Sequence, residues 1–322
     1  MTRRTRRRLV TGALVLLLVA VATAWIVKPW VPDIDLADPG PKGTRVHEAG
    51  VFANYYPADE PRSAAVLLLG GSEGGITDRV AELAVDLQRR GFSVLQPSYF
   101  GAPGQPGHLE RVPLETFDRA LAWLRRQPSV DPDRIAVVGH SKGAEAALLV
   151  GTRHPELRAV VAGAPSSVVW QGIDWDMPIN PGPSWTANGK PLASLGYSLW
   201  RPWRTVGQGY ENGLTHLSEH PEAEIRIERT RAPVLLVCGE ADNLWPACPM
   251  ARHLRARANE RGGPVVTVLA YEGAGHTAFG PPLKLADPHL TERFTGGTRR
   301  GNYLARRGGW PRVISFLEQH LA

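Results

Sequence analysis

The sequence predicts an α/β fold with a mostly parallel sheet that is covered by helices on both faces. Short apolar segments rich in valine, leucine and alanine alternate along the chain with longer segments of helical periodicity. The apolar segments are continuous rather than alternating, which is typical of strands buried on both faces. The chain has 322 residues, of which 43% are hydrophobic, so we expect one large core and a single main domain over residues 44–322.

The first 28 residues predict a membrane anchor or a signal peptide. An uncharged, mostly apolar run over 9–27 is just long enough to cross a bilayer as a helix. Positive charge before this run places the N-terminus in the cytoplasm and the main domain outside it. The net charge of the chain is +6, and five of these six charges come from Arg3, Arg4, Arg6, Arg7 and Arg8. The rest of the chain therefore gives no sign of binding nucleic acid.

Cleavage of this segment is left open by the sequence. Ala22-Thr23-Ala24 fits a signal-peptidase site and the arginine run loosely fits a twin-arginine export signal, which would give a secreted protein. The apolar run continues beyond that site, and Trp25 and Trp30 suit a membrane interface, which favours a retained single-pass anchor. Residues 29–43 contain four prolines and predict a stiff linker between membrane and domain.

The elements of the main domain follow in order. Residues 44–56 suit one or two edge strands, and a buried strand over 63–69 leads directly into the glycine-rich loop 70–75. A helix over 76–90 has its apolar residues at helical spacing and stops at Gly91. The other expected strands are 92–95, 135–138, 159–162, 234–237 and 265–269, and the other expected helices are 114–126, 144–150, 249–259 and 312–321.

Residues 165–229 interrupt this alternation. A segment of this length without a regular pattern inside a compact domain is usually a functional lid, so we expect a cap over the site. Its aromatic rings could line an apolar acyl pocket or simply pack the cap. The segment holds half of the ten tryptophans, namely Trp170, Trp175, Trp185, Trp200 and Trp203.

The candidate nucleophile is Ser141. It is the centre of Gly139-His140-Ser141-Lys142-Gly143, between the expected strand 135–138 and the expected helix 144–150. In a strand-turn-helix context, Gly-x-Ser-x-Gly is typical of a nucleophile elbow, because the two glycines remove side chains where the backbone turns sharply. The alternative interpretation is a glycine turn with an incidental serine.

A serine hydroxyl needs a base to take its proton and an acid to orient that base. Asp242 and Glu240 both follow the strand 234–237, and His276 follows the strand 265–269 through a glycine-rich turn. Parallel strands place their carboxyl ends at one edge of the sheet, so these side chains are expected to meet Ser141 there. Asp242 is favoured as the acid, because Glu240 lies nearer the strand end, where a side chain points into the structure.

An oxyanion hole requires two backbone N–H donors. Lys142 supplies the first as the residue after the nucleophile, and the loop 70–75 is the expected source of the second. We assign the second donor to Ser72, with Gly71 and Glu73 as neighbouring candidates. The same loop lacks the Gly-Lys-Ser/Thr ending of a phosphate-binding loop.

Several other residues are expected to have supporting roles. His140 is expected to support the site rather than react, and Glu145 could form an ion pair or line the pocket. Cys238 and Cys248 could form a disulfide outside the cell, but the position of Cys238 at the end of an apolar strand favours an unpaired core residue. No metal site or cofactor is expected, and a late cluster suits a solvated surface: Arg299, Arg300, Arg306 and Arg307.

Taken together, these motifs resemble the C-terminal catalytic domain of the acyl-CoA thioesterase and bile-acid-CoA:amino acid N-acyltransferase family, over about residues 44–322. The resemblance rests on Gly-His-Ser-Lys-Gly-Ala-Glu at 139–145, Gly-Glu-Ala-Asp-Asn-Leu-Trp-Pro at 239–246, Gly-Ala-Gly-His at 273–276, the glycine-rich loop 70–75 and the ending from Gly296-Gly297 through Trp310 to Phe316-Leu317. The resemblance implies an α/β-hydrolase fold with Ser141 as nucleophile, where some members carry cysteine, and with Asp242 and His276 completing the triad. The family's N-terminal immunoglobulin-like domain is not expected here, since only the linker precedes the hydrolase domain.

The resulting expectation is an exported serine hydrolase that cleaves or transfers the acyl group of an ester or thioester through an acyl-serine intermediate. The alternatives are a carboxylesterase, a dienelactone-hydrolase-like enzyme or a peptidase on the same fold. A catalytically idle binding protein of the cell surface is the alternative from a different class.

Overall fold

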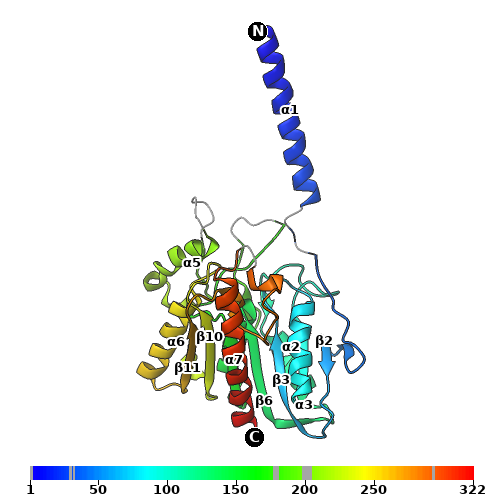
Figure 1. Ribbon diagram of the computed structural model, residues 1–322, viewed down its shortest axis with the longest axis vertical. Helices are drawn as coiled ribbons and strands as arrows, with labels where there is room; N and C mark the ends of the chain where they lie inside the picture. Colours follow the sequence, from blue (N-terminus) through cyan, green and yellow to red (C-terminus); the bar gives the residue numbers. More distant parts are fainter. Residues whose placement is uncertain (1–2, 29–30, 32, 177–180, 198–204, 292–293) are drawn as a thin grey trace.

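The computed structural model describes the chain except for residues 1–2, 29–30, 32, 177–180, 198–204 and 292–293 (Figure 1). Its main sheet has eight strands, and the two edge pairs β1·β2 and β2·β4 are antiparallel while the other pairs are parallel. In spatial order the strands are β1 (Thr44–Glu48), β2 (Val51–Tyr56), β4 (Ser93–Ser98), β3 (Ser63–Leu69), β6 (Val130–His140), β7 (Ala159–Gly163), β10 (Val234–Gly239) and β11 (Val266–Tyr271). The predicted mostly parallel sheet is confirmed.

The continuous apolar strands are explained by two separate cores, one on each face of the sheet. Along β3, Leu67 and Leu69 pack into one core whereas Val66 and Leu68 pack into the other. Successive side chains of a strand point to opposite faces, so a strand covered on both sides must be apolar at every position. The first face is covered by α3 (Glu115–Arg125), α4 (Lys142–Arg153) and α6 (Ala247–Arg261), and the second by α2 (Asp78–Arg89) and α7 (Arg299–Leu321).

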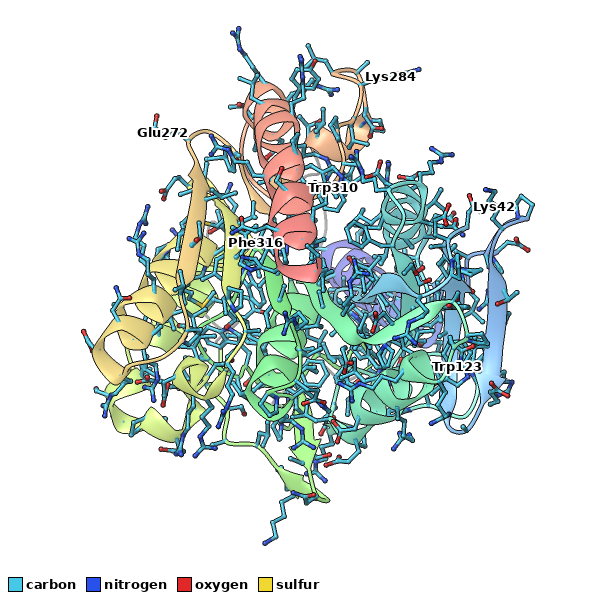
Figure 2. All side chains as sticks on the ribbon, turned by 90° about the horizontal axis from the view of Figure 1, so that it is seen from below. Lys42, Trp123, Glu272, Lys284, Trp310 and Phe316 are labelled. Atoms are coloured by element: carbon cyan, nitrogen blue, oxygen red, sulfur yellow. A yellow bond between two sulfur atoms is a disulfide. The ribbon has the colours of Figure 1, made fainter. Side chains whose placement is uncertain are left out.

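The helix α7 is much longer than the sequence indicated. The prediction of a final helix over 312–321 missed its first half, because glycines at 301, 308 and 309 and Pro311 argue locally against a helix. Trp310 lies on α7 (Figure 2) and is buried. Its Nε1 donates to Asp86 Oδ2 of α2 at 2.7 Å, which ties α7 to α2 on this face of the sheet. The prediction that Arg306 is a solvated surface residue is also wrong, since it is 4% exposed.

The expected cap is present between β7 and β10. It contains β8 (Trp185–Ala187) and β9 (Lys190–Pro191), which join β5 (Val112–Pro113) in a small second sheet, and the helix α5 (Val206–Leu214). The described part of the cap also includes the short 3-10 helices η1 (Leu217–Glu219), η2 (Pro221–Ala223) and η3 (Ile227–Arg229). Trp170 and Trp185 are fully buried packing residues of the cap, whereas Trp200 and Trp203 lie outside the described residues.

The helix α1 (Arg3–Val27) projects away from the domain, on the opposite side from the C-terminus (Figure 1). Its Val10–Val27 segment is long and apolar enough to cross a membrane, and none of that segment is buried. At its end, the Lys28 ammonium pairs with Asp176 of the cap at 2.7 Å. Farther along, the linker is docked on the domain at Asp35 and Ala37, because Ile76 N donates to Asp35 O at 2.7 Å and Ala37 N donates to Ile76 O at 2.8 Å.

Candidate active site

The backbone at Ser141 has the geometry of a sharp turn between strand β6 and helix α4. Its φ of 59° and ψ of −123° are unusual for a residue with a side chain, and such strain is found mainly at functional sites. Both flanking glycines are required for steric reasons. A Cβ at Gly139 would lie 2.0 Å from Gly143 O, and a Cβ at Gly143 would lie 2.1 Å from Gly70 O.

The structure brings the three candidate residues Ser141, His276 and Asp242 into one hydrogen-bonded chain. His276 Nε2 lies 2.9 Å from Ser141 Oγ, and His276 Nδ1 lies 2.8 Å from Asp242 Oδ2. The side chains of His276 and Asp242 are only 5% and 2% exposed, so water competes little for these bonds. This connectivity suits proton transfer from the hydroxyl to an imidazole whose ring and tautomer are fixed by a carboxylate.

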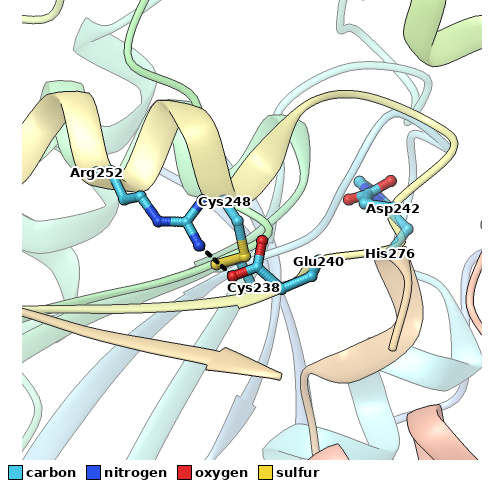
Figure 3. Close-up of a disulfide and its surroundings, with 6 residues drawn as sticks. All are labelled: Cys238, Glu240, Asp242, Cys248, Arg252 and His276. Atoms are coloured by element: carbon cyan, nitrogen blue, oxygen red, sulfur yellow. Dashed lines mark hydrogen bonds and ion pairs between the residues drawn. A yellow bond between two sulfur atoms is a disulfide. The ribbon is translucent and has the colours of Figure 1, made fainter. Parts of the chain in front are cut away.

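The two candidate acids are separated clearly by their partners. Glu240 points toward α6 and pairs with Arg252, while Asp242 faces His276 (Figure 3). The second oxygen of Asp242 accepts from Leu244 N at 2.8 Å and Trp245 N at 3.3 Å. Since both oxygens of Asp242 are engaged, its carboxylate has one fixed orientation toward the imidazole.

A disulfide closes the loop that carries Asp242. Cys238 at the end of β10 is bonded to Cys248 in the first turn of α6, ten residues later (Figure 3). The expectation that Cys238 is an unpaired core residue is therefore wrong. Both sulfurs are buried, because the start of α6 packs directly against the end of β10 and brings Cys248 into the same core.

The loop that carries His276 is held by backbone-directed hydrogen bonds from several elements. Asn302 of α7 is fully buried and its Oδ1 accepts from Gly275 N at 2.7 Å, while His276 N donates to Thr295 O at 2.8 Å. Arg306, also on α7, donates to Thr277 O at 3.2 Å. The missed first half of α7 thus supports the candidate base.

His140 contacts the candidate base without joining the proton path. Its Nε2 lies 2.9 Å from His276 O, and its ring stacks against Phe279 with centroids 5.9 Å apart. Burial, and to a smaller extent the neighbouring His276, lowers the pKa of His140 to about 3. A neutral His140 can donate its Nε2 proton to that carbonyl, which agrees with the expected supporting role.

The glycine-rich loop is oriented by a residue that sequence reasoning missed. The buried hydroxyl of Tyr99 donates to Gly70 O at 2.7 Å and to Gly71 O at 2.8 Å. No cis peptide bond occurs in the described chain, and across a trans peptide the carbonyl and the next N–H point in opposite directions. The bond to Gly71 O therefore turns the N–H of Ser72 away from Tyr99. Burial raises the pKa of Tyr99 well above its usual value, so its hydroxyl stays a donor.

A buried ion pair connects the nucleophile helix to the cap. Lys142 Nζ lies 2.7 Å from Glu145 Oε2, and the two side chains are 2% and 0% exposed. The other oxygen of Glu145 accepts from Trp185 Nε1 at 2.7 Å and from Trp170 N at 3.3 Å. Burial lowers the pKa of Lys142 and raises that of Glu145, while the attraction between them opposes both shifts. The pair fixes the cap relative to α4.

Two pockets meet at Ser141. The first has a volume of about 350 Å³ and lies beneath the cap, with Ser72 and Lys142 beside the serine. The second has a volume of about 450 Å³ and shares Ser72, Ser141 and Leu244 with the first, but it is lined in addition by His276. Aromatic rings dominate the first pocket, namely Trp175, Tyr197, Tyr210, Trp245 and Phe294.

One group among the described residues has the spacing to hold a metal ion. The ligand atoms of His108, Asp174 and Asp176 lie within 4.8 Å of one another in the cap region. Asp176 already has a cationic partner in Lys28. None of these three residues belongs to the chain of hydrogen bonds at Ser141.

Comparison with known proteins supports both the fold and a family. The chain is 28% identical over 88% of its length to acyl-coenzyme A thioesterase 6 of Mus musculus, and equally to bile acid-CoA:amino acid N-acyltransferase of the same organism. The match spans 66% of each relative, just under two thirds of their length. A putative dienelactone hydrolase from Klebsiella pneumoniae superposes with a TM-score of 0.56 at 16% identity, covering 86% of this chain and 97% of that one. This confirms the expected α/β-hydrolase fold.

The family assignment comes from the larger part of the chain. Residues 112–322, which include the candidate triad and the cap, match the family model described as BAAT / Acyl-CoA thioester hydrolase C terminal. The chain therefore belongs to the family of bile acid-CoA:amino acid N-acyltransferase and acyl-CoA thioester hydrolase C-terminal domains.

Proposed function

We propose that this protein is an exported, membrane-tethered serine hydrolase that cleaves or transfers the acyl group of an ester or thioester. The observation that carries the proposal is the hydrogen-bonded chain from Ser141 through His276 to Asp242, at 2.9 and 2.8 Å. The family relationship and the aromatic pocket beside the serine support an apolar acyl substrate. The exposed apolar segment of α1 supports the tether.

In this mechanism His276 Nε2 takes the proton of Ser141 as Oγ attacks the acyl carbonyl carbon. Asp242 holds the imidazole in the required tautomer and stabilises the imidazolium that forms. The oxyanion of the tetrahedral intermediate would be held by the N–H groups of Lys142 and Ser72. Helix α4 begins at Lys142, and the first N–H groups of a helix have no acceptor within the helix, which leaves this donor available.

The intermediate then collapses as His276 gives its proton to the leaving oxygen or sulfur. The product of this step is an acyl-Ser141 ester, and water or an acceptor amine or alcohol attacks it with His276 as base again. Hydrolysis and acyl transfer therefore use the same residues and differ only in the second nucleophile.

Replacement of the nucleophile tests the proposal. With p-nitrophenyl esters and acyl thioesters of several chain lengths, Ser141→Ala is expected to lower kcat by at least about 10⁴-fold while the chain stays folded. Ser218→Ala removes an exposed serine of η1 and serves as the matched control, with unchanged kcat. Activity of Ser141→Ala within about tenfold of the parent would refute the mechanism. An absence of turnover in the parent chain would favour an idle binding protein.

A further inference from the structure

The position of His276 distinguishes the roles of the two pockets at Ser141. Both pockets contact Ser141 and Ser72, but His276 lines only the second one. The group that leaves during acylation must accept the proton carried by His276 Nε2, so it has to lie on the side of that imidazole. The second pocket therefore receives the leaving group, and the aromatic pocket beneath the cap receives the acyl chain.

From the charges around this second pocket we infer that it favours neutral or cationic leaving groups and disfavours polyanionic ones such as coenzyme A. The inference rests on the proposed acyl-transfer function and specifies its substrate class. Four carboxylates and two guanidiniums line the pocket, which gives these side chains a net charge of −2: Asp35, Glu73, Asp78, Glu82, Arg79 and Arg306.

Both arginines of this pocket are already engaged by the protein. Arg79 lies 3.3 Å from Glu82 and 3.3 Å from Asp287. Arg306 donates to the backbone carbonyls of Thr277 at 3.2 Å and Pro281 at 2.8 Å. A phosphate is normally recognised by a guanidinium that can offer two parallel N–H groups, and these two are directed at protein acceptors instead.

The N-terminus of helix α2, which also borders the pocket, is occupied in the same way. Such a terminus ordinarily attracts anions through its exposed N–H groups and its dipole. Here Asp35 Oδ2 accepts from Asp78 N at 3.1 Å, and Asp78 adds its own carboxylate in the first turn. The linker that carries Asp35 is fixed to the loop beside it by the hydrogen bonds at Ile76. A phosphate would therefore meet two carboxylates where it would otherwise find donors.

Matched thioesters test the inference, with one acyl chain joined to three thiols of different charge. The thiols are coenzyme A, which carries about four negative charges, neutral N-acetylcysteamine and cationic thiocholine. At low salt, kcat/KM for the coenzyme A thioester is expected to be about tenfold below that for the thiocholine thioester. The difference should shrink to about threefold or less in 0.5 M salt, because the lining carboxylates are largely exposed and screened.

Reversing one charge of the second pocket tests whether its carboxylates cause the preference among leaving groups. Glu82→Lys changes the pocket charge by two and frees Arg79 from one partner, so it should raise kcat/KM for the coenzyme A thioester about threefold or more. The neutral thioester should change by less than about twofold. Glu318→Lys is the matched control, since Glu318 lies 12 residues beyond the pocket residue Arg306 along α7, about 18 Å away at 1.5 Å per residue.

Each outcome has a distinct meaning. Equal or better turnover of the coenzyme A thioester at low salt, or a coenzyme A rate that Glu318→Lys raises as much as Glu82→Lys does, would overturn the inference while leaving the acyl-serine chemistry intact. If none of the three thioesters nor a p-nitrophenyl ester is turned over with dependence on Ser141, the proposed function fails and the inference falls with it.

Discussion

The hydroxyl of Tyr99 controls the direction of one peptide group beside the candidate nucleophile. Tyr99→Phe removes the donor to Gly70 O and Gly71 O, so the peptide before Ser72 loses the bond that orients its N–H. Losing one oxyanion-hole donor outright costs about 10²–10³ in kcat, so loosening it should cost about tenfold with KM within about twofold. Steady-state kinetics with a p-nitrophenyl ester measure both constants.

A matched tyrosine provides the control for this variant. The hydroxyl of Tyr55 bonds to Ser129 Oγ at 2.6 Å, away from the glycine-rich loop. Tyr55→Phe should leave kcat unchanged, although it also loses one hydroxyl hydrogen bond. Equal values of kcat for Tyr99→Phe and the parent chain would show that Tyr99 does not orient the active-site peptide.

The lowered pKa of His140 predicts how the free energy of unfolding depends on pH. Its pKa is about 3 in the folded chain and about 6.5 when unfolded, so between these values the unfolded chain binds one more proton. The associated stability is complete above pH ~6.5 and is lost as the pH falls toward ~3. Near pH 5 this residue should contribute a slope of about 1.3 kcal/mol per pH unit.

Denaturant unfolding of the parent chain and of His140→Gln at pH 5 and pH 6 measures this slope. The variant should show a pH dependence that is smaller by about the contribution of one proton. An identical slope in the two proteins would mean that His140 is not held neutral by the fold.

At the residue scale, the candidate triad could be found from sequence because each member follows a recognisable strand in a known order. The Gly-x-Ser-x-Gly motif located Ser141, and the turn after β11 located His276. Tyr99 could not be found in this way, because its role depends on a contact between the end of β4 and the loop after β3. No spacing in the chain encodes such a contact between two loops.

At the scale of elements, the disulfide between β10 and α6 is expected to stabilise the loop that carries Asp242. A cross-link that closes a loop of about ten residues contributes about 2–3 kcal/mol in the chain-entropy model. The double variant Cys238→Ala/Cys248→Ala should therefore lose about that much unfolding free energy and show no further change on adding a thiol reductant. The parent chain should lose stability on reduction, and a parent that is insensitive to the reductant would contradict the bridge.

Elements with strong periodicity could be predicted, whereas those defined by tertiary contacts could not. The strands followed from their continuous apolar runs, because burial on two faces imposes such runs, and α2 followed from apolar residues at helical spacing on its one buried face. The first half of α7 carries helix-disfavouring residues, and its stability comes from buried contacts such as those of Asn302 and Trp310. The docking of the linker at Ile76 is likewise a tertiary contact, and the prolines of the linker predict its stiffness but not what it binds.

At the scale of the whole molecule, α1 is expected to hold the protein in a membrane. An epitope tag after Ala322 should be recovered in the membrane fraction at full length, and it should be released by detergent but not by high salt. The double variant Leu16→Arg/Val19→Arg should shift the tagged chain to the soluble fraction. Each charge at the centre of a membrane-spanning helix raises the free energy of insertion by about 2.5–3.5 kcal/mol. A soluble, shortened product from the parent chain would indicate cleavage after Ala24 instead.

Reaction of the intact chain with a fluorophosphonate tests directly whether His276 and Asp242 activate the serine between β6 and α4. The serine Oγ attacks phosphorus and displaces fluoride, and peptide mass spectrometry then locates the adduct. We expect one adduct, on Ser141, that is absent in Ser141→Ala and forms far more slowly in His276→Gln. A chain that stays unmodified, or one that is modified only at another serine, would contradict the proposed nucleophile.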